Sequence, residues 1–262
     1  MKKNSEVKIK KEKSKQNVVL LSAGSGSRMG TLTQQLPKSL LQLADKKVID
    51  WILNAIISRT DGEIVVVVGY EANKVEQHIA LHYSGRVKTV INPRYAEDVN
   101  ILSVEFGVAA LTAPENGYLI VETDIILEDD AWSKVFNQID CGGSYWISKG
   151  VYNADLTGGI IQCDKDNNVL SIEYKPQYDP LFDGWAKMIG LLYVGPDQVE
   201  NDRRLRQSAI LDTINQYYLM PWHHSVNELP ARLLDLGESF AVSFNTERDF
   251  ILAEKAFLQR QE

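Results

Sequence analysis

The 262-residue sequence holds only two cysteines, Cys141 and Cys163, and neither a Cys-x-x-Cys pair nor a histidine at metal spacing accompanies them. A disulfide framework and a cysteine-based metal centre are therefore excluded, and two buried thiols in a reducing compartment are expected. No apolar run approaches the roughly 20 residues that cross a bilayer. The lysine-rich start leads into a polar segment, so neither a membrane span nor a signal peptide is expected. These features predict a cytoplasmic protein.

Charge is distributed unevenly along the chain. Residues 1–16 carry seven lysines and two glutamates, a net charge of +5, whereas the whole chain carries −7, which leaves about −12 on residues 17–262. An acidic body of this kind argues against a nucleic-acid-binding domain. We interpret residues 1–16 as a basic, disordered tail, with contact to RNA or a membrane surface as the alternative.

The remaining residues suffice for one large domain, because 44% of the sequence is hydrophobic. We expect a single domain over residues 17–262, with a nucleotide-binding half at 17–140 and an acceptor-binding half at 141–262. No internal repeat or low-complexity linker interrupts it.

Strand and helix patterns alternate through the first half. Apolar runs typical of covered parallel strands lie at residues 17–21, 63–68, 87–91 and 118–121, and amphipathic helix patterns lie between and after them, near 48–58, 72–83, 100–111 and 130–139. This order predicts an α/β fold with a doubly wound, mostly parallel sheet in three α/β/α layers. Ligands are then expected at the carboxyl ends of the strands. The second half is richer in strands, at 145–148, 159–163, 169–174 and 186–194. Helices are expected near 203–217 and 246–258, where Thr246 and Asp249 form a capping box.

A glycine- and serine-rich loop follows the first strand. Ser22, Ala23, Gly24, Ser25 and Gly26 carry little or no side chain, so backbone N–H groups can approach phosphate oxygens closely. Arg28 and Lys38 add positive charge beside this loop. The pattern predicts a site for a nucleoside triphosphate; a plain strand-to-helix turn is the alternative.

Two commoner glycine motifs do not fit. A P-loop needs lysine and serine or threonine after its last glycine, but Gly30 is followed by Thr31. A dinucleotide fingerprint has its third glycine one residue earlier than Gly30, and it places an acidic residue about 20 positions later at a strand end, which is absent.

Three further residues carry groups suited to phosphate chemistry. Asp124 follows a buried strand at the ligand-binding edge, where a carboxylate can hold Mg²⁺; a turn cap is the alternative. Asn245 precedes the last helix and is either a second Mg²⁺ ligand or a turn residue. Lys175 follows another strand, and a surface ion pair with Glu173 is its alternative role.

Taken together, these segments resemble the nucleotidyltransferases that activate sugar phosphates and small phosphorylated alcohols. The resemblance is carried by Leu-Ser-Ala-Gly-Ser-Gly-Ser-Arg-Met-Gly at 21–30, Leu-Pro-Lys-Ser-Leu-Leu at 36–41 and Val-Val-Gly-Tyr at 67–70. Residues 92–103, Asn-Pro-Arg-Tyr-Ala-Glu-Asp-Val-Asn-Ile-Leu-Ser, resemble the bacterial CTP:phosphocholine cytidylyltransferases in particular.

The resemblance implies a role for each matching position. The loop at 24–30 would hold the triphosphate, with Arg28 on the departing pyrophosphate and Lys38 at the α-phosphate. Asp124 and Asn245 would bind Mg²⁺, and Lys175 the acceptor phosphate. The residues expected near the base are Asn92, Asn100 and Ser103. Two departures bear on the substrate: Asn245 stands where many relatives have aspartate, and Leu-Thr-Gly-Gly at 156–159 replaces the tryptophan of phosphocholine enzymes.

The expected activity is Mg²⁺-dependent transfer of CMP from CTP to a small phosphomonoester or phosphonate, with release of pyrophosphate. The acceptor would be phosphocholine-like, aminoethylphosphonate-like or a phosphorylated amino acid. A sugar-1-phosphate nucleotidyltransferase using UTP, dTTP or GTP is the alternative within the class. A nucleotide-binding module or a dinucleotide-dependent oxidoreductase is the alternative outside it. The sequence leaves the oligomeric state open, with a homodimer as one alternative.

Overall fold

The structure is a computed structural model that describes residues 13–260. Most of the expected basic tail lies outside these residues. Residues 13–16, expected to belong to the tail, are packed against the domain. Ser14 is buried, its N–H donates to the Arg59 carbonyl at 2.9 Å, and its hydroxyl donates to Asp140 at 2.7 Å. The tail boundary at residue 16 is therefore wrong, because backbone pairing with residues 59–61 fixes the chain before the first strand.

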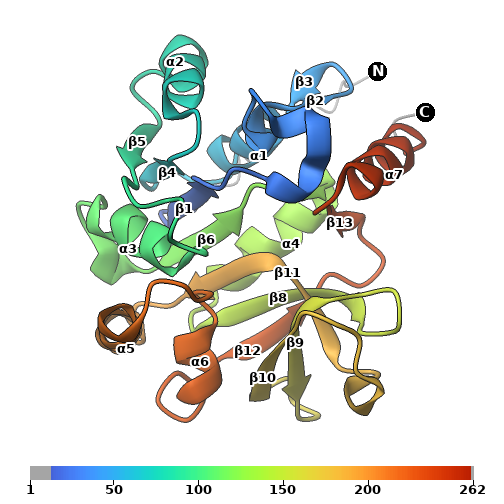
Figure 1. Ribbon diagram of the computed structural model, residues 1–262. Helices are drawn as coiled ribbons and strands as arrows, with labels where there is room; N and C mark the ends of the chain where they lie inside the picture. Colours follow the sequence, from blue (N-terminus) through green and yellow to red (C-terminus); the bar gives the residue numbers. More distant parts are fainter. Residues whose placement is uncertain (1–12, 261–262) are drawn as a thin grey trace, which may run out of the picture.

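A nine-stranded sheet runs through the described part of the chain (Figure 1). Its order is β10-β9-β11-β6-β1-β4-β5, and β8 pairs with both β11 and β12 off this path. The neighbours β6, β1, β4 and β5 are parallel, whereas β11 joins β6 antiparallel. The strands are β1 (Asn17–Ser22), β4 (Ile64–Val68), β5 (Lys88–Ile91), β6 (Tyr118–Glu122), β8 (Tyr145–Val151), β9 (Gly158–Cys163), β10 (Val169–Lys175), β11 (Ala186–Val194) and β12 (Arg232–Asp235).

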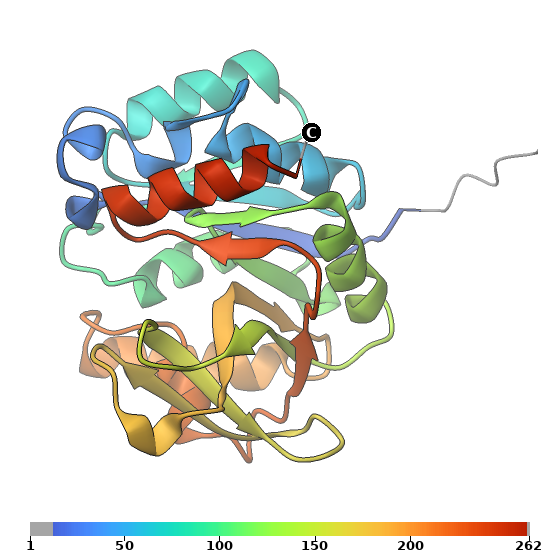
Figure 2. The same cartoon turned by 90° about the vertical axis from the view of Figure 1, so that its right-hand side faces the viewer.

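Helices cover both faces of this sheet, which confirms the three-layer expectation. In β1, Val18 and Leu20 enter one hydrophobic core while Val19 and Leu21 enter the other, as strand alternation requires. The first core is covered by α1 (Val48–Ile57), α2 (Ala72–His82), α4 (Asp129–Ile139) and α7 (Glu247–Leu258), and the second by α3 (Ile101–Ala109), α5 (Val199–Asp212) and α6 (Met220–His224). Figure 2 shows α7 running alongside β13 (Ala241–Ser243), which pairs with β7 (Ile125–Leu127).

Several short elements escape the sequence patterns because they span too few residues for a period. They are β2 (Gln42–Leu43), β3 (Lys46–Lys47) and the 3₁₀ helices η1 (Ser27–Thr33), η2 (Lys38–Leu40), η3 (Pro114–Asn116) and η4 (Pro180–Phe182). Two of these, η1 and η2, follow β1 and carry Arg28 and Lys38. The phosphate-loop region is thus a chain of tight turns and not the start of a long helix.

Capping groups fix the ends of two helices near the site. Thr246 and Asp249 form the expected capping box of α7. At α3, Asn100 occupies the N-cap position, but its side chain does not cap the helix. The Asp98 carboxylate accepts the N–H groups of Leu102 and Ser103 instead, each within 2.9 Å. Asn100 is thereby released for another contact.

A buried polar cluster holds α5 and α6 against the sheet. The Asp202 carboxylate accepts the Tyr118 hydroxyl at 2.5 Å and the Trp222 indole N–H at 2.9 Å, and it also pairs with the Arg206 guanidinium. Because a buried charge left without its partner destabilises a protein by about 3–5 kcal/mol, this cluster fixes the 213–219 segment between the two helices. No helix within residues 13–260 is long and apolar enough to span a bilayer.

Candidate active site

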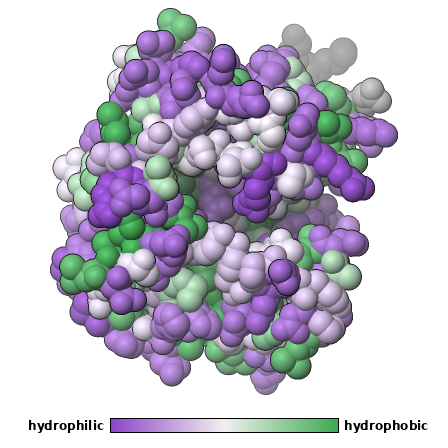
Figure 3. Space-filling view, viewed as in Figure 1, coloured by the Kyte–Doolittle hydropathy of each residue, from purple (hydrophilic) through white to green (hydrophobic). Residues whose placement is uncertain are grey.

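A pocket of about 260 Å³ opens where the two halves of the chain meet. Figure 3 shows it as a hollow near the middle of this face. Its lining includes residues that follow β1 and β6, together with residues of β9, β10 and β11 and of the 213–219 segment. The pocket therefore lies at the carboxyl ends of the parallel strands, where this class of sheet binds its ligands.

The glycine-rich turn forms one wall. Ala23, Gly24, Arg28 and Lys38 line the pocket, and the space beside the Gly24 Cα is open, so a ligand can approach the backbone. Gly26 adopts φ +63°, a conformation that side-chain-bearing residues rarely take, and its carbonyl accepts the Thr33 hydroxyl at 2.9 Å. The turn thereby returns the chain toward Lys38.

Lys38 and Asp124 face each other across this wall. The Lys38 Nζ lies 2.6 Å from Asp124 Oδ2, and both side chains are largely buried. Asp124 Oδ1 is also buried, and it has no hydrogen-bond partner among the described residues. A buried carboxylate oxygen of this kind is destabilising unless a cation or donor reaches it. It is therefore a suitable ligand for Mg²⁺, which prefers oxygen ligands and takes one or two from protein carboxylates.

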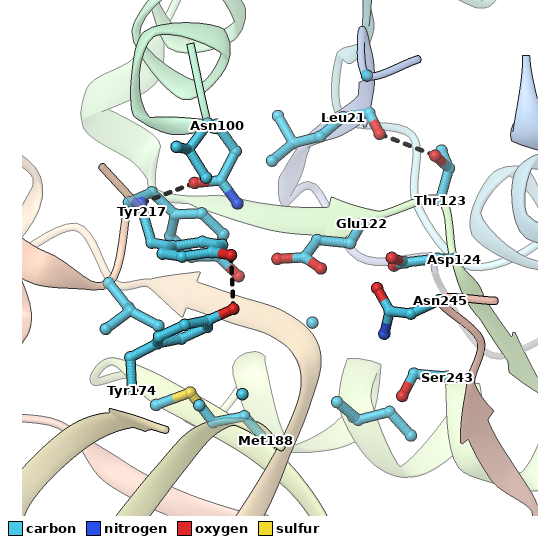
Figure 4. Close-up of a pocket in the computed structure, with 18 of the residues that line it drawn as sticks. Leu21, Asn100, Glu122, Thr123, Asp124, Tyr174, Met188, Tyr217, Ser243 and Asn245 are labelled. Carbon is cyan, nitrogen blue, oxygen red and sulfur yellow. Dashed lines mark hydrogen bonds between the residues drawn. The ribbon is translucent and has the colours of Figure 1, made fainter. Parts of the chain in front are cut away.

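Asn245 is brought beside Asp124 by the backbone. The Phe244 N–H donates to the Asp124 carbonyl at 2.8 Å, next to the pairing of β13 with β7. The Asn245 Oδ1 accepts a hydrogen bond from Arg28 Nη2 at 2.7 Å. Figure 4 shows the Asn245 and Asp124 side chains next to each other at the edge of the pocket. The two expected metal ligands thus converge, although their sequence positions are far apart.

Glu122 lines the pocket, and the sequence analysis did not single it out. It is half-buried at the end of β6, and Figure 4 shows its carboxylate directed into the pocket, between Asn100 and Asp124. Burial and the charge of Asp124 raise the pKa of the Glu122 carboxyl to about 7, although Lys38, Tyr218 and Lys187 oppose this. The alternation Glu122, Thr123, Asp124 could have indicated it, since residues two apart share one side of an extended segment.

Lys187 was missed as well, because no motif surrounds it. It lines the pocket from β11, and its ammonium donates to the carbonyls of Met188 at 2.9 Å and Gly159 at 3.3 Å. Burial lowers the pKa of Lys187, against the attraction of Glu122 and Asp124. The pocket therefore contains a second, half-buried lysine, which comes from the 141–262 half of the chain.

Tyrosines form the wall opposite the glycine turn. Tyr174 from β10 and Tyr217 from the 213–219 segment stack with ring centroids 4.1 Å apart. Asn100 Oδ1 accepts the Tyr218 N–H at 2.8 Å, which leaves its amide nitrogen directed into the pocket (Figure 4). The released Asn100 side chain thus connects α3 to this wall.

The structure does not bring every expected site residue into the lining. Asn92 is fully buried and donates to Asp98 and Ser103, both at 2.9 Å, so its side chain supports the turn before α3. The Lys175 Nζ lies 3.7 Å from Glu173 Oε2 and 3.5 Å from the centre of the Phe182 ring. Lys175 is not among the residues that line the pocket. The residues of the expected set that line the pocket are Ala23, Gly24, Arg28, Lys38, Asn100, Ser103, Asp124 and Asn245, whereas Ser22, Ser25, Gly26, Asn92 and Lys175 do not.

Fold and site together define a nucleotide-binding transferase: a doubly wound sheet with a glycine-rich turn, paired cations and a carboxylate at its ligand-binding edge. Residues 18–152 match the family model of the MobA-like NTP transferase domain, and the chain belongs to this family. It is a nucleotidyltransferase.

The chain is also similar in sequence to individual enzymes of known activity. The chain is 26% identical over 226 residues to a 2-aminoethylphosphonate cytidylyltransferase of Lancefieldella rimae, covering 84% of this chain and 82% of the relative. It is 26% identical to a UTP–glucose-1-phosphate uridylyltransferase of Haemophilus ducreyi, covering 57% of this chain and 61% of that protein.

Two solved structures share the fold. The CTP:phosphocholine cytidylyltransferase of Streptococcus pneumoniae superposes with a TM-score of 0.77 at 17% identity, over 93% of this chain and 99% of that one. The inositol-1-phosphate CTP transferase of T. maritima gives a TM-score of 0.74 at 12% identity, over 93% and 97%. Both likenesses extend across the two halves of this chain.

Proposed function

We propose that the protein is a Mg²⁺-dependent cytidylyltransferase that transfers CMP from CTP to a small phosphomonoester or phosphonate and releases pyrophosphate. The observation that carries the proposal is the convergence of Lys38, Arg28, Asp124 and Asn245 on one pocket beside the glycine-rich turn. The similarity to a 2-aminoethylphosphonate cytidylyltransferase over most of both chains supports CTP as the donor.

The reaction needs position and charge, not a covalent enzyme intermediate. An acceptor oxygen attacks the α-phosphorus of CTP, a new P–O bond forms, and the bond to the bridging oxygen breaks in line with it as pyrophosphate leaves. Lys38 neutralises charge that develops on the α-phosphate, and Arg28 neutralises the departing pyrophosphate. Asp124 and Asn245 would hold Mg²⁺, which supplies Lewis-acid charge neutralisation when bound. Asn100 and Ser103 also line the pocket, and we assign them to the base on the family resemblance.

The acceptor is proposed to carry a primary ammonium group, because Glu122 faces the pocket. A half-buried carboxylate beside a second one, Asp124, is stabilised by a ligand that brings both positive charge and N–H donors. A quaternary ammonium brings charge without donors and is bound better by open aromatic faces. Tyr174 and Tyr217 have turned one face each toward the other. Aminoethylphosphonate-like compounds and phosphorylated amino alcohols or amino acids fit these groups better than phosphocholine does.

The lysine nearest the acceptor is a second point of the proposal. Lys175 was expected to hold the acceptor phosphate, but it lies outside the lining, whereas Lys187 lies within it. We assign the acceptor phosphate to Lys187. In this assignment the ammonium of Lys187 binds the acceptor phosphate. The negative charges of Glu122 and Asp124 both act on Lys187 and favour its protonated form.

A sugar-1-phosphate nucleotidyltransferase is the second candidate. Two observations favour it. One is the similarity to a glucose-1-phosphate uridylyltransferase. The other is the segment Glu173-Tyr174-Lys175-Pro176, which is similar to a motif of sugar enzymes.

Pyrophosphate release decides between the two. Each NTP is incubated with Mg²⁺ and a panel of aminoethylphosphonate, phosphorylated amino acids, phosphocholine and sugar 1-phosphates. Release with CTP and an amine-bearing acceptor supports the proposal. Release only with another NTP and a sugar phosphate establishes the second candidate. A protein that binds CTP without turnover on any acceptor contradicts both.

A further inference from the structure

Two side-chain pairs at the site join residues of opposite expected roles. Lys38 and Arg28 are expected to bind phosphate oxygens, and Asp124 and Asn245 are expected to bind the metal. In the structure Lys38 Nζ lies 2.6 Å from Asp124 Oδ2, and Arg28 Nη2 lies 2.7 Å from Asn245 Oδ1. Each phosphate-binding cation therefore occupies an oxygen of a metal ligand.

We propose that Lys38 acts as the internal counter-ion of Asp124 and that Arg28 occupies the amide oxygen of Asn245, so that the triphosphate and the divalent cation bind as a thermodynamically coupled pair. The proposal rests on the proposed function, because it takes the roles of these four residues from it. It adds that in the nucleotide-free protein Lys38 and Arg28 lower the affinity of Asp124 and Asn245 for a metal ion.

Burial makes the Lys38–Asp124 pair the stronger of the two. The side chains are 21% and 8% exposed, so water compensates each charge poorly when its partner leaves. When Lys38 turns toward a phosphate, Asp124 needs a new cation. When a metal ion takes Asp124, Lys38 needs a new anion. Each ligand thus removes a penalty from the binding of the other.

The second carboxylate oxygen of Asp124, Oδ1, is not paired with Lys38. Oδ1 is buried and has no hydrogen-bond partner within residues 13–260, so one carboxylate oxygen of Asp124 stays uncompensated while Lys38 holds the other. Arg28 is exposed, and its partner Asn245 is neutral, so this second pair adds a smaller share. Coupling between two sites is reciprocal, and it commonly amounts to 5–150-fold in affinity.

The test measures Mn²⁺ binding to nucleotide-free protein from the electron paramagnetic resonance signal of the free ion. Wild type is compared with Lys38→Met and Arg28→Gln. Lys187→Met serves as the matched control, since Lys187 is a half-buried positive charge of the same pocket whose ammonium bonds to backbone carbonyls and not to Asp124. We expect Lys38→Met to bind Mn²⁺ about tenfold more tightly than wild type. The affinity of Arg28→Gln for Mn²⁺ should rise a few-fold. The affinity of Lys187→Met should rise less than that of Lys38→Met.

The reciprocal arm uses inorganic tripolyphosphate and CTP as probes, by calorimetry with and without Mg²⁺. In wild type, Mg²⁺ should increase the affinity of the protein for both probes. In Lys38→Met this increase in affinity should be about tenfold smaller. Because tripolyphosphate has no base, this arm holds even if CTP is not the substrate, and failure of the proposed function is then seen separately in the pyrophosphate assay.

Unchanged or weaker Mn²⁺ binding by Lys38→Met overturns the proposal, since Lys38 would then support the metal site or be irrelevant to it. A gain equal to that of Lys187→Met also overturns it, because the pocket's overall charge would explain the effect. Thermal melting in metal-free buffer establishes that Lys38→Met is folded. Should it not fold, the exposed Arg28→Gln variant gives the same decision on its own pair.

Discussion

The hydroxyl oxygens of Tyr174 and Tyr217 lie 2.5 Å apart, so one hydrogen bond joins β10 to the segment between α5 and α6. Burial and this hydrogen bond raise the pKa of Tyr174 above its usual range, so the hydroxyl stays protonated at neutral pH. The contact closes the wall of the pocket opposite the glycine turn.

Removing that contact should weaken acceptor binding. A hydrogen bond of this kind contributes about 1 kcal/mol. We therefore expect Tyr217→Phe to raise the KM for the acceptor about fivefold and to leave the KM for the NTP unchanged in steady-state assays. Tyr178→Phe is the control, because its hydroxyl bonds to Asp183 on the surface. Equal effects of the two variants would mean that the Tyr174–Tyr217 contact has no part in acceptor binding.

Lys38→Ala should reduce turnover by about 10²-fold or more, because it removes a charge-stabilising donor that is already positioned for the α-phosphate. The measurement is kcat for pyrophosphate release at saturating NTP. Lys74→Ala is the control, since Lys74 bonds to the Gln35 carbonyl and to Glu71 at the surface. Near-normal turnover of Lys38→Ala would contradict the role assigned to Lys38.

Glu122→Gln should discriminate between acceptors that differ only in their amine. We expect the KM for 2-aminoethylphosphonate to rise at least tenfold, because a charge-assisted hydrogen bond to the ammonium is lost. The KM for ethylphosphonate, which has no amine, should change little. Glu173→Gln is the matched control, since Glu173 pairs with Lys175 outside the pocket lining. Equal effects on both acceptors would show that Glu122 does not bind the ammonium.

Asp50 should contribute stability at neutral pH that disappears in acid. Burial alone would raise its pKa, but hydrogen bonds from His78 and Tyr83, the charge of His78 and the Lys47 N–H together hold the pKa below its usual value. A carboxyl group with a lowered pKa in the folded state stabilises above its unfolded pKa, near 3.9, and this is lost as pH falls through the folded value.

The variant Asp50→Asn should therefore be less stable than wild type by about 1 kcal/mol at pH 7. The two free energies of unfolding should converge below about pH 4. Urea unfolding at a series of pH values tests this. A difference in the free energy of unfolding between wild type and Asp50→Asn that stays constant down to pH 3 would contradict this prediction.

The general architecture could be predicted from the sequence because its elements are long and periodic. The strands at β1, β4 and β6 are unbroken apolar runs, and strand β11 was predicted with the bounds that the structure gives it, Ala186–Val194. The capping box of α7 was predicted because both of its residues lie within four positions of each other. Such signals are local, and a single sequence is sufficient to show them.

The acceptor side of the site could not be predicted in the same way. Tyr217, Tyr218 and Lys187 stand in no recognisable pattern, and only the pairing of distant strands and the Asp202 cluster bring them together. Asn92 and Lys175 show the converse: each matches a family position, yet hydrogen bonds and ion pairs with their neighbours hold both side chains outside the lining.

The antiparallel pairing of β11 with β6 places both halves of the chain in one continuous sheet. Backbone hydrogen bonds across the middle of a sheet do not bend as a hinge does, so the two halves cannot open and close as separate bodies. Access for substrates and products must depend on the turns around the rim. The turns that join β8 to β9 and β10 to β11 lie far from Lys38 and Asp124 along the chain. Lineages could therefore lengthen or exchange these turns to accept new head groups while the phosphate-transfer machinery stays the same.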